Sequence, residues 1–208
     1  MGVSVFAMAA SSCAKLTPIG GPATSATVAV QDPRTVGLAA ADLPAGLSLC
    51  PVSGDIDRYL QRLEADGSPS YEVTADQWTT YKHLGANAGW VTSFTKTQED
   101  CSLRLGERKD PSAISFAIRF REPTGAVRAF GQGFLGLRPA PLMSAPGLVQ
   151  GPATQLAENS WIYDQTGQSP SLFVAFWTNR QFALFLLTEQ LPAALSRQAA
   201  ASMNGRVR

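Results

Sequence analysis

The chain has 208 residues, of which 45% are hydrophobic, enough apolar material for one sizeable core. Seventeen Lys and Arg residues against sixteen Asp and Glu residues leave a formal net charge of +1. No overall positive field is therefore available to draw the protein to nucleic acid, and we expect no nucleic-acid partner.

The N-terminal segment carries a short apolar run over residues 3–10, followed by Ala10-Ser11-Ser12 in front of Cys13. This pattern resembles the lipobox of bacterial lipoproteins, in which the Cys becomes the first residue of the mature chain and carries the lipid. The resemblance implies a signal-like segment over residues 1–12 and a lipid on Cys13. It departs from the family at Ala10, where Leu is usual, and in having no Lys or Arg before Cys13. The alternative is a short apolar segment with a buried thiol.

Residues 13–40 are expected to form a flexible linker, because they are rich in Ala, Thr, Pro and Gly and show no sustained helical or strand period. A linker of this kind would hold a domain clear of a bilayer. Residues 171–187 form the other long hydrophobic run, but Asn179-Arg180-Gln181 at its centre excludes a membrane span. We therefore expect residues 41–208 to be a single globular domain outside the cytoplasm, anchored to the membrane only through the N-terminal lipid.

Two further cysteines, Cys50 and Cys101, make an even pair once Cys13 is assigned to the lipid. An oxidising compartment would join them in a disulfide. Closing a loop of about 50 residues would stabilise the fold by about 4 kcal/mol in the chain-entropy model. Two unpaired buried thiols are the alternative. A zinc site is disfavoured because the chain has no CxxC or HxxxH spacing and His83 is its sole histidine.

Four helices are indicated along the chain. Helical spacing of apolar residues over 53–65 predicts the first. The second is expected to begin at a capping box of Thr74 and Gln77, with Val73 packed on Trp78, and to end before Gly85. A third, weakened by glycines, is expected over 123–137, and a closing helix has Pro192 near its start and Asn204-Gly205 past its end. The residues expected to face the core are Ile56, Tyr59, Leu60, Leu63, Trp78, Tyr81, Leu84, Val127, Phe130 and Phe134.

Alternating side chains predict strands over residues 89–95 and 112–121. On the second strand one face is expected to pack, with Ile114, Phe116, Ile118 and Phe120. The other face, with Ser115, Ala117, Arg119 and Arg121, is expected to meet water. Residues 148–164 offer one or two extended pieces, and 171–188 predict a hairpin of two apolar strands. The order of elements predicts an α+β fold, an antiparallel sheet of about five to six strands with helices packed on it.

Few motifs point to chemistry. GQGFLG at 131–136 matches a dinucleotide fingerprint, but a weak helix precedes it where a strand is needed. GANAG at 85–89 is interpreted as a helix end and a turn. No nucleophile motif accompanies His83. The acidic pairs are assigned to helix starts or turns, and four large aromatic residues to the core, with an apolar ligand pocket as the alternative. These residues are Asp55, Asp57, Glu99, Asp100, Trp90, Trp161, Phe176 and Trp177.

The segments DLPAGLSLC, GWVTSF and GAVRAF, followed by a closing helix, resemble uncharacterised exported domains of Gram-positive and Chloroflexota-type bacteria. The resemblance covers residues 42–205 and implies an exported α+β module, similar to the PsbP/Mog1-like sandwich, with no assigned site. We expect a surface-tethered, non-enzymatic module without cofactor or metal that docks a protein partner at the cell surface. The alternatives are a carrier of a small apolar ligand or lipid, and an enzyme whose site the sequence does not reveal.

Overall fold

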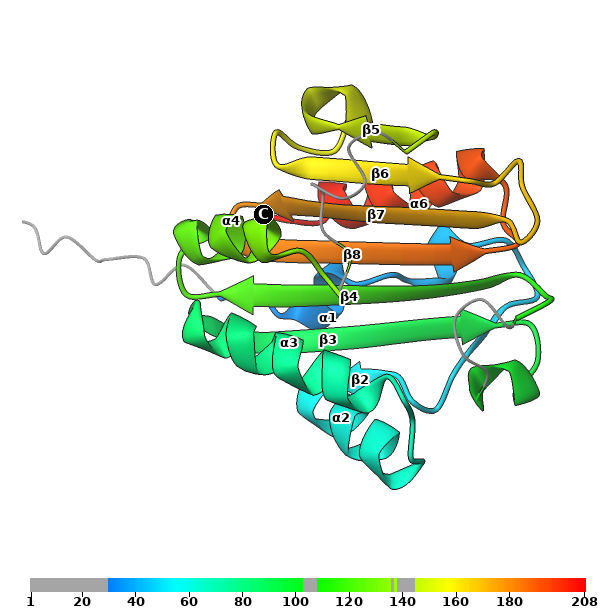
Figure 1. The fold of residues 1–208 in the computed structure, drawn as a ribbon, viewed down its shortest axis with the longest axis horizontal. Coiled ribbons are helices and arrows are strands. Elements are labelled where there is room, and N and C mark those ends of the chain that lie inside the picture. Colours follow the sequence, from blue (N-terminus) through cyan, green and yellow to red (C-terminus); the bar gives the residue numbers. More distant parts are fainter. Residues whose placement is uncertain (1–29, 103–107, 136, 138–144) are drawn as a thin grey trace, which may run out of the picture. The chain divides into compact units, whose positions relative to one another are not determined.

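An antiparallel sheet of eight strands is the framework of the part of the chain that the computed structural model describes, residues 30–102, 108–135, 137 and 145–208 (Figure 1). The strand order is β1-β3-β4-β8-β7-β6-β5, with β2 paired to β3. The strands are β1 (Ser48–Leu49), β2 (Gly54–Asp55), β3 (Ala86–Thr95), β4 (Ser112–Phe120), β5 (Leu148–Gln150), β6 (Ser160–Asp164), β7 (Leu172–Asn179) and β8 (Phe182–Glu189). The α+β class is confirmed, but the predicted number of strands is too low. The short strands β1, β2 and β5 span too few residues to show an alternating pattern.

Helices cover both faces of this sheet. Figure 1 shows α2, α3 and α4 in front of it and α1 and α6 behind it. The α-helices in the described residues are α1 (Pro33–Val36), α2 (Ile56–Ala65), α3 (Tyr71–His83), α4 (Pro123–Gln132) and α6 (Ala193–Gly205); the 3-10 turns are η1 (Ala40–Asp42), η2 (Glu99–Ser102) and η3 (Gly151–Thr154). None of the helices in these ranges is both long and apolar enough to cross a bilayer.

The strand β4 is buried on both faces, which corrects the prediction that Ser115 and Ala117 face water. The first face packs against α2, α3 and α4 as predicted. The second face belongs to another apolar cluster, in which Ala117 lies with Val36 of α1 and Met203 of α6. The backbone N–H of Leu38 donates a hydrogen bond to the Ser115 hydroxyl at 3.1 Å. Only tertiary structure could show this, because small residues such as Ser and Ala suit either environment.

Residues 31–40, which the composition places in the linker, pack against the sheet instead. Val36 and Leu38 are buried. The Arg206 guanidinium just after α6 holds this segment, donating to both carboxylate oxygens of Asp42 at 2.8 and 2.9 Å and to the Gly37 carbonyl at 2.8 Å. Residues 1–29, with the signal-like segment and Cys13, lie outside the described residues.

The boundaries of α3 and α6 differ from their predicted positions. The helix α3 begins at Tyr71, so Thr74 is an internal residue whose hydroxyl donates to the Ser70 carbonyl at 2.7 Å. Gly85, with φ of +96°, follows the helix end as predicted. The helix α6 includes Asn204, whose side-chain amide donates to the Leu156 carbonyl at 2.7 Å and accepts from the Trp177 indole at 3.1 Å. These long-range hydrogen bonds hold the last turn in helical conformation.

The helix α4 packs through Phe130, as predicted, and through its smallest residues, whereas Val127 is 44% exposed. Gly125 faces α3 so closely that an added Cβ would lie 2.5 Å from the Leu84 carbonyl oxygen. Ala126 and Ala129 are fully buried on the same side. The helix therefore lies close to the sheet, and Phe134, just beyond its end, stacks on Phe185 with ring centroids 4.5 Å apart.

Candidate functional site

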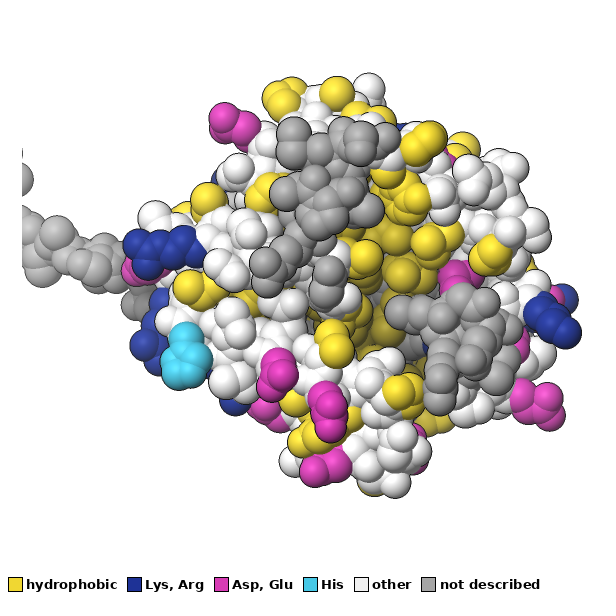
Figure 2. Space-filling model, viewed as in Figure 1, with side chains coloured by type: hydrophobic (Ala, Val, Ile, Leu, Met, Phe, Trp, Pro, Cys, Tyr) yellow, Lys and Arg dark blue, Asp and Glu magenta, His cyan; other side chains and the backbone are white. Residues whose placement is uncertain are grey.

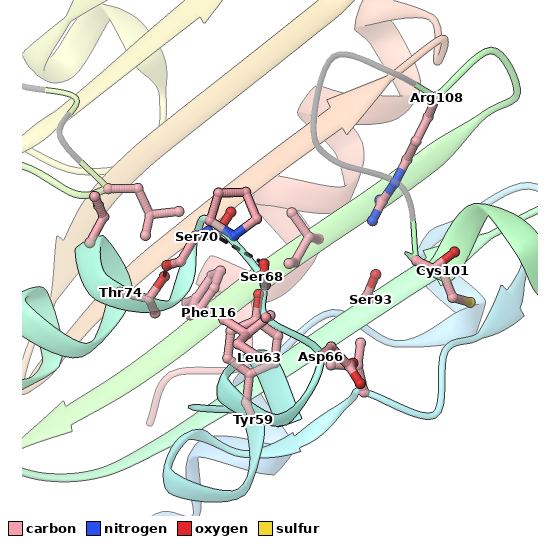
Figure 3. Close-up of a pocket in the computed structure, with 17 residues that line it drawn as sticks. Tyr59, Leu63, Asp66, Ser68, Ser70, Thr74, Ser93, Cys101, Arg108 and Phe116 are labelled. Carbon is pink, nitrogen blue, oxygen red and sulfur yellow. Dashed lines mark hydrogen bonds between the residues drawn. The ribbon is translucent and has the colours of Figure 1, made fainter. Parts of the chain in front are cut away.

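A cleft of about 690 Å³ opens on the face of the sheet that α2, α3 and α4 cover. Figure 2 shows hydrophobic side chains gathered in a hollow on this face, and Figure 3 shows the lining residues. The floor comes from β3 and β4, one wall from α2, α3 and the turn between them, and the opposite end from η2 and Arg108. The residues that line it are Val52, Tyr59, Leu63, Asp66, Gly67, Ser68, Pro69, Ser70, Val73, Thr74, Ser93, Cys101, Ser102, Arg108, Ile114, Phe116 and Leu135.

The face of the sheet beneath the cleft changes from polar to apolar along the strands. Directly paired residues on neighbouring strands share a face of the sheet, so the register defines rows across it. The first row is Thr95, Ser112 and Glu189, the second is Ser93, Ile114 and Leu187, and the third is Val91, Phe116 and Phe185. Successive rows are about 7 Å apart, given the rise per strand residue. The first row lies just beyond the lining, so Ser93 in the second row is the polar group of the floor and Ile114 and Phe116 are its hydrocarbon part.

Arg108 lies over the polar end with a side chain only 6% exposed. Its Nε is 4.0 Å from Oε2 of Glu189, which also accepts a hydrogen bond from the Ser112 hydroxyl at 3.2 Å. Burial lowers the pKa of Arg108, and the nearby Glu189 carboxylate opposes that shift. The two side chains thus form a buried ion pair, a group whose charges compensate each other away from water.

Tyr59 of α2 brings a phenol to the cleft. Burial raises its pKa to about 12, although the Arg108 charge opposes the shift. The ring packs edge-on against Phe116, with centroids 5.6 Å apart. At neutral pH the hydroxyl is therefore protonated, and it can donate a hydrogen bond.

Ser93 of β3 supplies a buried hydroxyl at the same end. The residue is 1% exposed, and its Oγ has no hydrogen-bond partner among the described residues. Its backbone is satisfied, since the Ser93 N–H donates to the Ser53 hydroxyl at 2.9 Å. A buried hydroxyl without a partner costs free energy, so one that lines a cleft is a candidate contact for a ligand.

Cys50 and Cys101 lie at disulfide distance, with Cα atoms 5.6 Å apart. Cys50 follows β1, and Cys101 belongs to η2 at the end of the cleft. The Thr95 hydroxyl lies 3.2 and 3.1 Å from the two sulfur atoms. The link therefore ties one end of the cleft to the edge of the sheet.

Most residues singled out in the sequence lie away from the cleft. His83 is exposed at the end of α3. Glu99 and Asp100 are exceptions, since they lie in η2 at one end of the cleft, and the Asp100 charge acts on Arg108. Asp55 caps α2 by accepting the Asp57 N–H at 2.9 Å, and Asp57 accepts the Trp78 indole N–H at 2.8 Å. Both acidic residues of that pair are therefore structural.

The glycine motif and the aromatic residues are likewise structural where they are described. The GQGFLG motif begins inside α4, so no strand leads into it, and its last glycine lies outside the described residues. Trp161, Phe176 and Trp177 are fully buried in the core, and Trp90 is partly exposed with the Arg34 guanidinium 5.8 Å from its ring.

The sequence did not single out Arg108 or Ser93, nor Tyr59 as more than a core residue. Arg108 stands in a charged stretch that looks like a solvated loop. Glu189 could have indicated this site from the sequence. It is a carboxylate at the end of a strongly apolar strand, and a buried acid needs a partner.

Neither a comparison with protein-family models nor one with curated proteins finds a match for this chain. Within the described ranges, His, Cys, Asp and Glu side chains do not gather in groups of three or more that could hold a metal ion.

Proposed function

We propose that this chain is a non-enzymatic binding module whose cleft takes one small, largely apolar molecule. The observation that supports this is a cleft of about 690 Å³ with Ile114 and Phe116 as its floor. Small-molecule sites typically have volumes of roughly 300–1,000 Å³, with apolar linings and a few polar groups that orient the ligand. Leu63 and Val52 add apolar side chains to the wall.

The geometry favours a small ligand over the protein partner that the sequence first suggested. A docking surface for a protein needs a contiguous apolar patch on the outside. The exposed large apolar residues in the described part lie on or near different elements, as Leu49 of β1, Val73 of α3 and Val127 of α4 illustrate. The cleft, in contrast, concentrates its apolar side chains in a concave site.

We also propose that the protein is exported and anchored to the membrane by a lipid on Cys13. A disulfide between Cys50 and Cys101 suits an oxidising compartment. A tethered carrier outside the cytoplasm would present its cleft to apolar molecules near the membrane. Mass spectrometry of the protein from a bacterial membrane should find an acyl chain on Cys13, and a protein without acylation would contradict the anchor.

The binding function is tested with N-phenylnaphthylamine, a neutral fluorophore that brightens in apolar sites. Titration of the full chain should give a saturable signal with one site per protein. Val73→Asp places a charge at the rim of the cleft and should weaken binding at least about threefold, since a buried apolar ligand avoids charge. Val127→Asp is the matched control, an exposed valine outside the lining, and should leave the affinity unchanged. Absence of saturable binding would reject the proposed function.

A further inference from the structure

We propose that the ligand carries a single uncharged oxygen head group, a hydroxyl or a carbonyl, which is bound at the Ser93 end of the cleft while its apolar body lies over Ile114 and Phe116. This inference rests on the proposed binding function and specifies the chemical class of the ligand. Figure 3 shows Ser93, Arg108 and Cys101 near one another in the view, with Ser70 and Thr74 farther along the lining.

Ser93 needs a hydrogen-bond partner that the protein itself does not supply within the described residues. Its hydroxyl is buried, lines the cleft and has no partner among the described residues. The neighbouring residue on β4 is Ile114, which offers no polar atom to it. An oxygen head group at this place would satisfy the hydroxyl, and the protonated phenol of Tyr59 is a second donor in the lining.

The charges at the polar end of the cleft disfavour a charged head group. Arg108 is already compensated by Glu189, whose carboxylate lies 4.0 Å from the guanidinium, and by the nearby charge of Asp100. A carboxylate head would add a second buried anion that competes with Glu189 for the same cation. An ammonium head would add a second buried cation beside Arg108. Uncompensated buried charge is strongly unfavourable, so a neutral head group matches the site best.

The order of the rows on the sheet places Ser93 where a head group would meet an apolar body. Ser93 belongs to the row between the polar row of Thr95, Ser112 and Glu189 and the apolar row that contains Phe116. A hydroxyl at that boundary can meet the head of a ligand whose body continues over the apolar floor. The site therefore matches an amphipathic neutral molecule, such as a long-chain alcohol or an ester.

The test uses the full chain loaded with N-phenylnaphthylamine and displaced by decanol, decanoate or decylamine at neutral pH. These probes share one alkyl chain and differ in head group. Decanol should displace the fluorophore at a concentration at least about tenfold lower than either ion, because charging the head adds an uncompensated buried charge. Ser93→Ala should weaken decanol roughly five- to tenfold, the loss of one hydrogen bond. Ser48→Ala, which removes an exposed hydroxyl outside the lining, is the matched control and should leave decanol unchanged.

The outcomes separate this inference from the function on which it rests. If decanoate or decylamine displaces the fluorophore best, or if Ser93→Ala leaves decanol unchanged, the head-group inference is overturned while the binding function stands. If the fluorophore itself does not bind the wild type, the proposed function fails and this inference fails with it.

Discussion

The two faces of the central sheet are covered in different ways. Behind the sheet, α6 packs Ala199, Ala200 and Met203 into a fully buried cluster that also holds large side chains of the sheet, such as Phe173 and Trp177. In front of the sheet, α2, α3 and α4 pack on large aromatic residues, and a cleft of about 690 Å³ opens where the lining turns polar. Both faces therefore bury large apolar side chains and small helix residues, and the front face differs by the polar groups, such as Ser93 and Arg108, that line one end of its cleft.

Loss of the disulfide should lower the stability of the protein more than any other change proposed here, and it should also weaken ligand binding on the front face. Replacing Cys50 and Cys101 together by Ser releases a link between residues 51 positions apart and should lower the free energy of unfolding by about 4 kcal/mol. Denaturant unfolding of the double variant and the wild type measures this change. Fluorophore binding should weaken as well, because Cys101 lines the cleft. If both thiols of the unreduced wild type react with an alkylating agent, this prediction fails.

Tyr59, on the front face, should make the free energy of unfolding of the protein fall at alkaline pH. Burial raises its pKa from 10.0 to about 12. Below pH 10 the phenol is protonated in both states and its whole contribution is present. Between pH 10 and 12 the unfolded chain releases the proton first, so the free energy of unfolding falls by up to about 2–3 kcal/mol. Urea unfolding at several pH values should show a shallower fall in Tyr59→Phe, and an unchanged slope would contradict the assignment.

Larger side chains should destabilise the protein more on the back face of the sheet than beside the front cleft. Ala117→Leu inserts a side chain behind β4, where α1 and α6 leave no space, and should cost about 1–3 kcal/mol. Ile114→Phe enlarges a residue of the same strand that borders the cleft, and should cost less than about 1 kcal/mol. Thermal unfolding of both variants provides the comparison. Equal losses would mean that the front face is packed as tightly as the back.

Two buried serines on opposite faces should respond differently to removal of the hydroxyl. Ser115→Ala leaves the Leu38 N–H without its acceptor and should destabilise the protein by about 1 kcal/mol. Ser93→Ala removes a hydroxyl that has no partner among the described residues, so stability should be unchanged or slightly higher. Chemical denaturation of the two variants tests the pair, and a larger loss at Ser93 would show that its hydroxyl is satisfied in the ligand-free protein.

The sequence predicts the elements of this fold better than it predicts their environment. The helix α2 is recognisable because Ile56, Tyr59 and Leu60 share one helical face, and the β7–β8 hairpin because two apolar strands flank a polar turn. The burial of β4 on both faces could not be predicted, since it depends on residues 31–40 and on α6, which lie far from β4 in the chain.

The cleft was harder still to predict from the sequence. Arg108 and Glu189 meet only because β4 and β8 are neighbours in the sheet, and Ser93 reaches the same place from β3. A local pattern records none of these contacts. Chemistry-bearing residues such as His83 and Asp57 attracted attention in the sequence, yet the first is exposed at a helix end and the second bonds Trp78.

Photolabelling tests the central claim, that the front cleft is the binding site, most directly. A decanol analogue with a diazirine on its alkyl chain is bound to the full chain, irradiated and located by mass spectrometry of proteolytic peptides. We predict labels on peptides that contain Tyr59–Thr74 and Arg108–Phe116, and loss of those labels when unlabelled decanol is in excess. Labels confined to α6 (Ala193–Gly205), or spread evenly over the chain and insensitive to decanol, would contradict the account.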